Sequence, residues 1–268
     1  MKKSRYTWFW LFLPVLLCAC GKQPSQTVEL NISHARKRAL ALFELKADQG
    51  AVLLDSLRPD KNGVCRFRVP CDSLRIYLLA SSGNEHFLCL TPMPHQDLRI
   101  SANYDSLVSS ATVQPIPATD SLCPSLILLA YQQQIAQAER TIRFYTDIWM
   151  ENRYQSTQVD SLHEACTRAI DSVMDTLRQE ARRLCRQNTA NLIPVVVINK
   201  AIGNRRVLDL SEPETLAFLL DCTKQMQRHN PQNPHVKRLM FQLARIDSYR
   251  KQEEIRLLEQ TGEEPQIP

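Results

Sequence analysis

The sequence predicts an α+β protein, in which a small antiparallel β-sandwich or barrel is followed by an α-helical region. Short apolar runs separated by turn residues recur over 27–104 at a spacing of roughly ten residues, which is typical of small all-β domains. Over 122–268 the apolar residues instead recur at intervals of three and four, the period of an amphipathic helix. We therefore expect a β domain over 27–104, a linker over 105–121 and a helical region over 122–268.

The β domain contains apolar runs that we expect to form strands. They lie at 28–32, 39–45, 52–57, 64–69, 74–80, 86–90 and 98–100. The turn Asp60-Lys61-Asn62-Gly63 favours a hairpin, because Asn-Gly adopts positive φ at little cost. The run after it alternates Cys, Phe and Val with two arginines, a period of two that gives one buried and one solvent-facing side.

The expected linker precedes the change to helical periodicity. Residues 103–124 are rich in Ser, Thr and Asp and include three prolines, which favours an extended chain. Apolar stripes with helical spacing follow at 128–149, 162–184, 216–226 and 236–246. The sequence Ser211-Glu212-Pro213-Glu214 is typical of a capping box that opens the third of these helices. A short apolar piece at 191–202, interrupted by Pro194, predicts another helix.

The first twenty residues predict a bacterial lipoprotein. A basic start is followed at 6–17 by an almost wholly apolar run of about 12 residues, which is shorter than the roughly 20 that span a membrane and fits a signal peptide. The sequence Leu17-Cys18-Ala19-Cys20-Gly21 then resembles a lipobox, although Cys18 is unusual at its position. We expect a signal peptide over 1–19, cleavage after Ala19, lipid on Cys20 and a tether over 20–26. An ordinary secretory signal with an incidental cysteine is the alternative.

The lipid on Cys20 would make the membrane the first partner of this chain. Each buried methylene contributes about 0.8 kcal/mol, so several acyl chains give near-permanent attachment. Gly21 and Lys22 place no acidic residue after the cysteine. We expect an outer-membrane lipoprotein that faces the periplasm, with surface exposure as the alternative.

Charge and glycine content argue against several function classes. Three of the 33 basic residues lie in the first five positions, which leaves 30 basic side chains against 28 acidic ones. No Lys/Arg cluster with interleaved aromatics occurs, so the sequence does not favour nucleic-acid binding. Glycine is scarce, at 6 residues, and no G-x-G-x-x-G or G-x-x-x-x-G-K motif is present. We expect no cofactor.

Cysteine and histidine give no recognised site. After Cys18 and Cys20, seven cysteines remain, at 65, 71, 89, 123, 166, 185 and 222, and no C-x-x-C occurs. Most are at apolar positions, which favours buried free thiols over disulfides; Cys65 with Cys71 or Cys89 is the first bridge to consider. The six histidines lack zinc-ligand spacing, and no G-x-S-x-G occurs. We therefore predict no metal site, no catalytic residues and no enzyme activity.

A family resemblance rests on several segments. They are 53–56, 62–67, 76–78 and 98–101 in the β region, 191–200 in the helical region, and the tail 262–268 with its Gly, Pro and Ile. Together they resemble the N-terminal part of exported thioredoxin-like lipoproteins of the TlpA type. Those proteins often begin with a small β domain, the domain of unknown function 4369, which is followed by a helical segment and a thioredoxin domain.

The resemblance implies an accessory role rather than redox chemistry. The W-C-x-x-C motif of the thioredoxin domain does not occur in this chain, so no redox residue is carried over. We expect a non-catalytic accessory or docking module, with a stand-alone envelope binding or structural lipoprotein as the alternative. The helices after Ser211 are expected to dock a thioredoxin-like protein or a second copy of the chain; packing within the chain, or a truncated remnant, are the rival interpretations.

Overall fold

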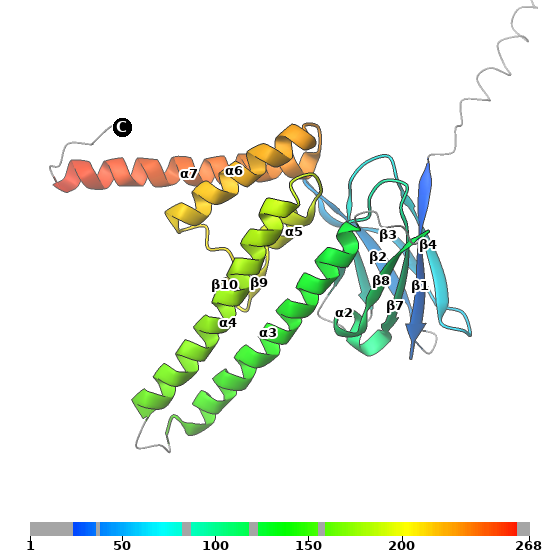
Figure 1. The fold of residues 1–268 in the computed structure, drawn as a ribbon, viewed down its shortest axis with the longest axis horizontal. Helices are drawn as coiled ribbons and strands as arrows, with labels where there is room; N and C mark the ends of the chain where they lie inside the picture. Colours follow the sequence, from blue (N-terminus) through cyan, green and yellow to red (C-terminus); the bar gives the residue numbers. More distant parts are fainter. Residues whose placement is uncertain (1–23, 36–37, 82–86, 118–122, 155–158, 262–268) are drawn as a thin grey trace, which may run out of the picture.

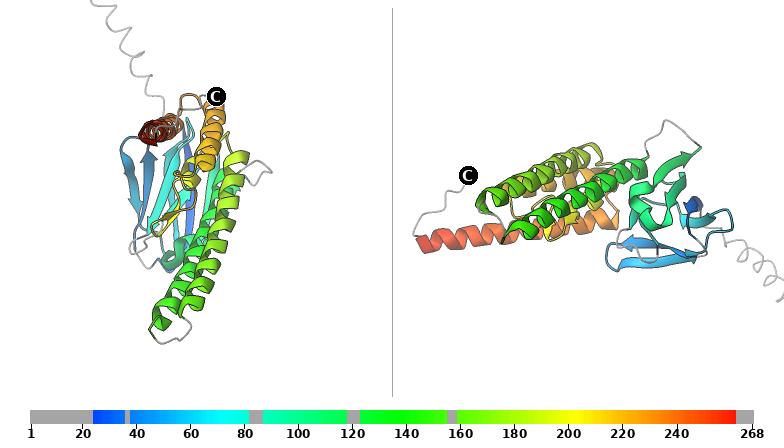
Figure 2. Two further views of the ribbon diagram at one scale, coloured as in Figure 1. Left: turned by 90° about the vertical axis from the view of Figure 1, so that its left-hand side faces the viewer. Right: turned by 90° about the horizontal axis from the view of Figure 1, so that it is seen from below.

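The computed structural model describes residues 24–35, 38–81, 87–117, 123–154 and 159–261 (Figure 1). These residues form two four-stranded sheets that share one core, with a helical region on one side of the sandwich (Figure 2). The predicted α+β class is confirmed.

The first sheet has the strand order β4-β1-β7-β8. It comprises β1 (Ser25–Ser33), β4 (Val64–Pro70), β7 (Asp97–Asn103) and β8 (Thr112–Ile116). β1 is antiparallel to β4 but parallel to β7, and β7 is antiparallel to β8. The parallel pair is an exception to the predicted antiparallel pattern. It forms because β1 and β7 are joined by a long crossover through the second sheet, and not by a hairpin.

The second sheet has the order β3-β2-β5-β6, and its neighbouring strands are antiparallel. It comprises β2 (Leu40–Lys46), β3 (Gly50–Leu57), β5 (Ile76–Ser81) and β6 (Leu88–Leu90). Each predicted apolar run overlaps a strand of one of the two sheets, although His86 lies outside the described residues.

The prediction of an extended linker over 105–121 is wrong for most of this segment. Within 105–121 the structure has the end of a 3-10 turn η1 (Tyr104–Ser106), a short helix α2 (Leu107–Ser110) and the strand β8. β8 pairs with β7 along its whole length, so this segment completes the first sheet. It looked like a linker because a short edge strand needs few apolar residues and tolerates proline. Residues 118–122 lie outside the described part of the chain.

The helical region contains two long helix pairs and a short helix between them (Figure 1). α3 (Pro124–Asn152) and α4 (Val159–Gln187) lie side by side, α5 (Ile193–Ile198) follows, and α6 (Pro213–His229) packs on α7 (Pro234–Thr261). A two-residue hairpin of β9 (Ala201–Ile202) and β10 (Arg205–Arg206) lies between α5 and α6. All four predicted long helices and the predicted short one are present.

The predicted capping box of α6 is wrong in its details. The N-cap residue is Glu212, and Pro213 is the first helical residue. The Ser211 hydroxyl donates to the carboxylate of Asp209 at 2.8 Å and does not cap the helix. Thr215 instead donates to the Glu212 carboxylate at 2.7 Å. The Ser211 hydroxyl bonds to Asp209 and not to the N-terminus of the helix, because the Asp209 carboxylate is only two residues away and forms a local turn with Ser211.

Two strands of the second sheet, β5 and β6, are covered on both faces. Tyr77, Leu79 and Leu88 belong to the core that the second sheet shares with the first sheet. Ile76 and Cys89 belong instead to the core of the helical region. The helices therefore form a third layer on the second sheet (Figure 2).

The first sheet has one face in water. Glu29 in the centre accepts hydrogen bonds from Arg66 on one side and Arg99 on the other, both at 2.8 Å, and the register places all three residues opposite one another. These two bonds lower the pKa of Glu29, and the bond from Arg66 has the larger effect. The predicted alternation of arginine with apolar residues in β4 is confirmed, because Cys65, Phe67 and Val69 are buried.

Candidate functional site

The helical region is fastened to the sandwich by side-chain amides of α3. The Cys89 N–H donates to Gln132 Oε1 at 2.8 Å, and Gln132 Nε2 donates to the Cys89 carbonyl at 3.0 Å. Gln132 is only 4% exposed, so these bonds are shielded from water. The amide thus pairs with strand β6 at two points, as the backbone of a further strand would.

Two other contacts hold the start of α3 in place. The Thr91 N–H donates to the Ser125 hydroxyl at 3.0 Å. Gln133 Nε2 donates to the carbonyls of Val108 at 3.2 Å and Ala111 at 3.0 Å, at the two ends of the turn that precedes β8. α3 is therefore fixed to both sheets of the sandwich.

The start of α7 is fixed to the second sheet as well. Asn233 Nδ2 donates to the Leu74 carbonyl at 3.1 Å, and the Arg238 guanidinium donates to the carbonyl of Ala47 in the turn between β2 and β3. These bonds close one side of the junction between the sandwich and the helices.

A cleft of about 580 Å³, which we call the junction cleft, opens at this place. Its walls come from the β2–β3 turn, β5, β6, α2, α3, α5 with the residues after it, and α7. The apolar part of the wall consists of Leu45, Ala47, Leu78, Phe87, Cys89, Val108, Ile135, Ala136, Val195, Val196, Ala201 and Leu239. The volume lies within the range of about 300–1,000 Å³ that is usual for small-molecule sites.

The remaining wall of the junction cleft is polar and carries both signs of charge. It includes the cations Lys46, Lys200 and Arg238 and the carboxylates Asp48 and Glu139. The ammonium groups of Lys46 and Lys200 have no ion pair or hydrogen bond within the part of the chain that the structure describes.

His235 also lines the cleft. Burial lowers its pKa below the usual 6.5, so the ring is neutral at pH 7 and adds no charge. The permanent cations of the wall are therefore the two lysines and Arg238.

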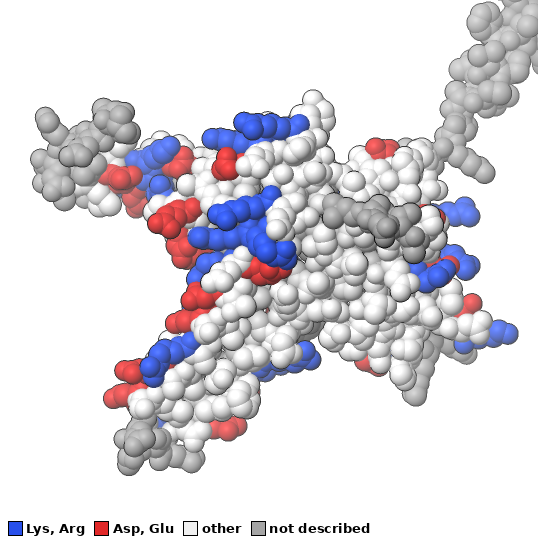
Figure 3. Space-filling view, in the orientation of Figure 1, with Lys and Arg blue, Asp and Glu red and all other residues white. Residues whose placement is uncertain are grey.

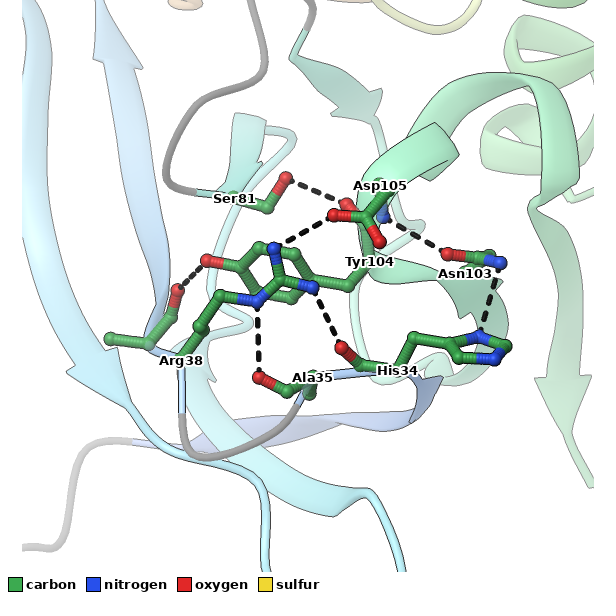
Figure 4. Close-up of polar contacts among 8 residues, drawn as sticks. His34, Ala35, Arg38, Ser81, Asn103, Tyr104 and Asp105 are labelled. Atoms are coloured by element: carbon green, nitrogen blue, oxygen red, sulfur yellow. Dashed lines mark hydrogen bonds and ion pairs between the residues drawn. The ribbon is translucent and has the colours of Figure 1, made fainter.

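Arg38 organises a second polar cluster, at the connection between β1 and β2 (Figure 4). Its guanidinium lies 4.0 Å from the centre of the Tyr104 ring, pairs with Asp105 at 2.8 Å and donates to the His34 carbonyl at 2.7 Å. The Tyr104 hydroxyl donates to the Ala39 carbonyl at 2.8 Å. The guanidinium and the tyrosine hydroxyl bond to neighbouring backbone and to Asp105, so these contacts hold the β1–β2 connection against η1.

The seven cysteines after Cys20 are all free and buried, as the sequence analysis favoured, and the suggested bridge from Cys65 to Cys71 or Cys89 is not formed. Burial raises the pKa of Cys65, Cys89 and Cys222 to about 11 in each case, and raises that of Cys185 further. These four thiols are consequently protonated and poor nucleophiles at neutral pH.

The fold brings Cys71 and His95 together, which the sequence did not indicate. Cys71 Sγ and His95 Nδ1 are 3.3 Å apart, although 24 residues separate them in the chain. In the described part of the chain no set of three His, Cys, Asp or Glu side chains is placed to hold a metal ion.

The residues predicted to carry the lipid anchor, Ala19 and Cys20, lie outside the described residues. Over the described residues, no helix combines the length and the apolar character that are needed to cross a bilayer. Figure 3 shows Lys, Arg, Asp and Glu intermixed over the helices, the pattern of solvated helix faces and not of a single basic patch.

Comparisons with protein-family models, with curated proteins and with solved structures found no match to this chain. The resemblance to TlpA-type lipoproteins therefore stays a prediction that rests on the segments quoted for it.

Proposed function

We propose that this chain is a lipoprotein of the bacterial cell envelope, anchored through lipid on Cys20, and that it works by binding and not by catalysis. The first twenty residues support the anchor, because they combine a short apolar run with Leu17, Ala19 and Cys20 at lipobox positions. The proposed location is the outer membrane, with the chain facing the periplasm.

The observation that carries the binding role is the junction cleft. It combines apolar side chains with five charged groups in one concave surface, and ligand sites likewise pair apolar surface with placed polar groups. Its walls are held by Gln132, Asn233 and Arg238, each of which bonds across the junction to the backbone of the sandwich. A cleft whose walls are fixed in this way loses little conformational freedom when a ligand binds.

The docking role is the second candidate, and the end of α7 supports it. From Arg245 onward most side chains of this helix are exposed, among them Tyr249 at 58%, Ile255 at 49% and Leu257 at 58%. At about 100° per residue Tyr249 and Leu257 lie within about 80° of each other, whereas Ile255 points at least about 120° away from both, so the three form no continuous apolar face. The junction cleft is therefore the better supported site, and docking of a thioredoxin-like protein or a second copy stays a prediction.

Mass spectrometry of the mature N-terminus tests the anchor. We expect acyl chains on Cys20 as the first residue and recovery of the protein with the outer membrane. The Cys18→Ser variant is the matched control, because it alters the neighbouring cysteine and should leave lipidation intact. An unmodified Cys20, or cleavage at another residue, contradicts the anchor.

Filling the cleft tests the binding role. The mature chain (21–268), exported through an unrelated signal peptide, is titrated with the neutral fluorescent probe N-phenyl-1-naphthylamine. Ala136→Trp places a large ring in the cleft and should abolish saturable binding, whereas Ala130→Trp, on an exposed side of the same helix, should not. Equal binding by both variants, or no saturable binding by the unaltered chain, would overturn the binding role of the cleft.

A further inference from the structure

We propose that the junction cleft takes a long-chain carboxylate, with its anionic head at the ammonium groups of Lys46 and Lys200 and its acyl chain on the apolar wall. This inference rests on the proposed binding role of the same cleft and adds the chemical class of the ligand.

The apolar wall provides the surface for the chain. Leu78 and Cys89 of the second sheet face the cleft together with Ile135, Val196 and Leu239 from three helices. Four of these residues are buried, between 4% and 8% exposed. An acyl chain on this surface would remove the remaining apolar area from water, which favours binding in proportion to the area covered.

The charges on the wall favour an anionic head. Arg238 is engaged by the Ala47 carbonyl, whereas the ammonium groups of Lys46 and Lys200 have no ion pair or hydrogen bond among the described residues. Asp48 and Glu139 also line the cleft, so its lining carries three permanent cations against two carboxylates. Both lysines are half-buried residues of the cleft, and their ammonium groups, which have no partner among the described residues, are available to pair with a carboxylate.

The backbone at Lys200 is held in place by two hydrogen bonds. Its own N–H donates to the Val197 carbonyl at 3.1 Å, and its carbonyl accepts from the Val207 N–H at 3.1 Å. Lys200 therefore follows α5 in a backbone held on both sides, while Lys46 ends strand β2 on the opposite element. Two cations from separate structured elements thus line one cleft, an arrangement that favours an anionic ligand.

An extended peptide fits the cleft less well. A peptide strand binds through the backbone groups of a sheet edge, and at β6 the N–H and carbonyl of Cys89 already bond to Gln132. A single acyl chain needs no such backbone partners, so the closed edge does not hinder it.

Displacement of the neutral probe by three ligands with the same twelve-carbon chain tests the class. The ligands are dodecanoate, dodecanol and dodecyltrimethylammonium, used as monomers with the mature chain. We expect dodecanoate to displace the probe at a concentration at least tenfold lower than the other two. Lys200→Gln and Lys46→Gln should each remove most of that preference, while Lys224→Gln, at an exposed lysine of α6, should keep it.

A variant with reversed charge tests whether the preference for dodecanoate depends on the charge of Lys200. Lys200→Glu should turn the preference toward dodecyltrimethylammonium, and thermal unfolding of each variant shows whether it is folded. Equal displacement by all three ligands would overturn the carboxylate inference and leave the binding role intact. Probe binding that survives Ala136→Trp would instead overturn the binding role itself. Binding to anionic lipid vesicles that depends on the two lysines, without displacement by monomeric dodecanoate, would assign the cations to a membrane surface and also overturn the inference.

Discussion

The two sheets of the sandwich share one core but differ in what lies on their other faces. The outer face of the first sheet carries Glu29, Arg66 and Arg99 and is open to water. The outer face of the second sheet carries Ile76 and Cys89, and helices cover it at β5 and β6. The sequence difference is simple, because β4 alternates arginine with apolar residues whereas β5 and β6 are apolar on both sides. A strand without alternation thus indicates where a third layer attaches.

The largest expected loss of stability distinguishes the buried from the exposed side of strand β4 in the first sheet. Phe67 is 1% exposed, so Phe67→Ala should lower the free energy of unfolding by about 3–5 kcal/mol through lost burial and a cavity. Arg68, its exposed neighbour, is the matched control, and Arg68→Ala should change the free energy of unfolding by less than about 0.5 kcal/mol. Urea unfolding measures both. Similar losses for the two variants would contradict the solvent-facing side of this sheet.

The next effect concerns the layer that covers the second sheet. Gln132→Ala removes both partners of the Cys89 backbone in a buried place, which should lower the free energy of unfolding by about 2–3 kcal/mol. Gln134→Ala, at an exposed position two residues along α3, should have almost no effect. A Gln132→Ala variant as stable as Gln134→Ala would mean that the amide does not join the layers.

Thiol labelling sharpens the comparison at Cys89. Burial raises the pKa of Cys65 and of Cys89 to about 11, so both should react slowly with iodoacetamide at pH 8 in the folded chain and quickly in urea. Cys65 faces the sandwich core, whereas Cys89 is protected by the helices. Gln132→Ala should therefore speed labelling of Cys89 more than that of Cys65, as peptide mass spectrometry would show. Fewer than seven reactive thiols in urea without reductant would reveal a disulfide.

The smallest effect is expected on the open face of the first sheet. Arg66 and Arg99 lower the pKa of Glu29, so the stability that they contribute is present above the unfolded value of about 4.5 and is lost as the pH falls through the lower folded value. Glu29→Gln should reduce the free energy of unfolding at pH 7 by less than about 1 kcal/mol, because the pairs are solvent-accessible. Urea unfolding at low and high salt measures this loss of stability. A loss that does not shrink as the salt concentration rises would contradict this interpretation.

The sequence predicted the strands and helices better than it predicted their connections. Long runs with a period of two or of about three and a half residues mark elements wherever one side is buried, as in β4 and α4. β8 was missed because an edge strand of five residues with Pro115 in it has little periodicity. The sequence also left open how the helical region meets the sandwich, since that contact depends on polar side chains.

The candidate site was not predictable in the same way. The walls of the junction cleft come from segments that are far apart in the chain, and no short motif joins Lys46 to Lys200. One signal was present, because Gln132 is four residues after Leu128 and three before Ile135, on the apolar stripe of α3. A polar residue at such a position must find partners when it is buried, and it can be flagged for that reason.

The amide of Gln132 also affects how copies of this protein meet one another. A strand at the end of a sheet normally offers backbone groups to which a neighbouring chain can add a strand, and this is a common route to aggregation. At β6 the groups of Cys89 are occupied by Gln132, and at the end of the first sheet Pro115 in β8 has no N–H to donate. On the proposed membrane surface, where many copies are confined to two dimensions, these two edges resist the growth of a sheet from one molecule into the next.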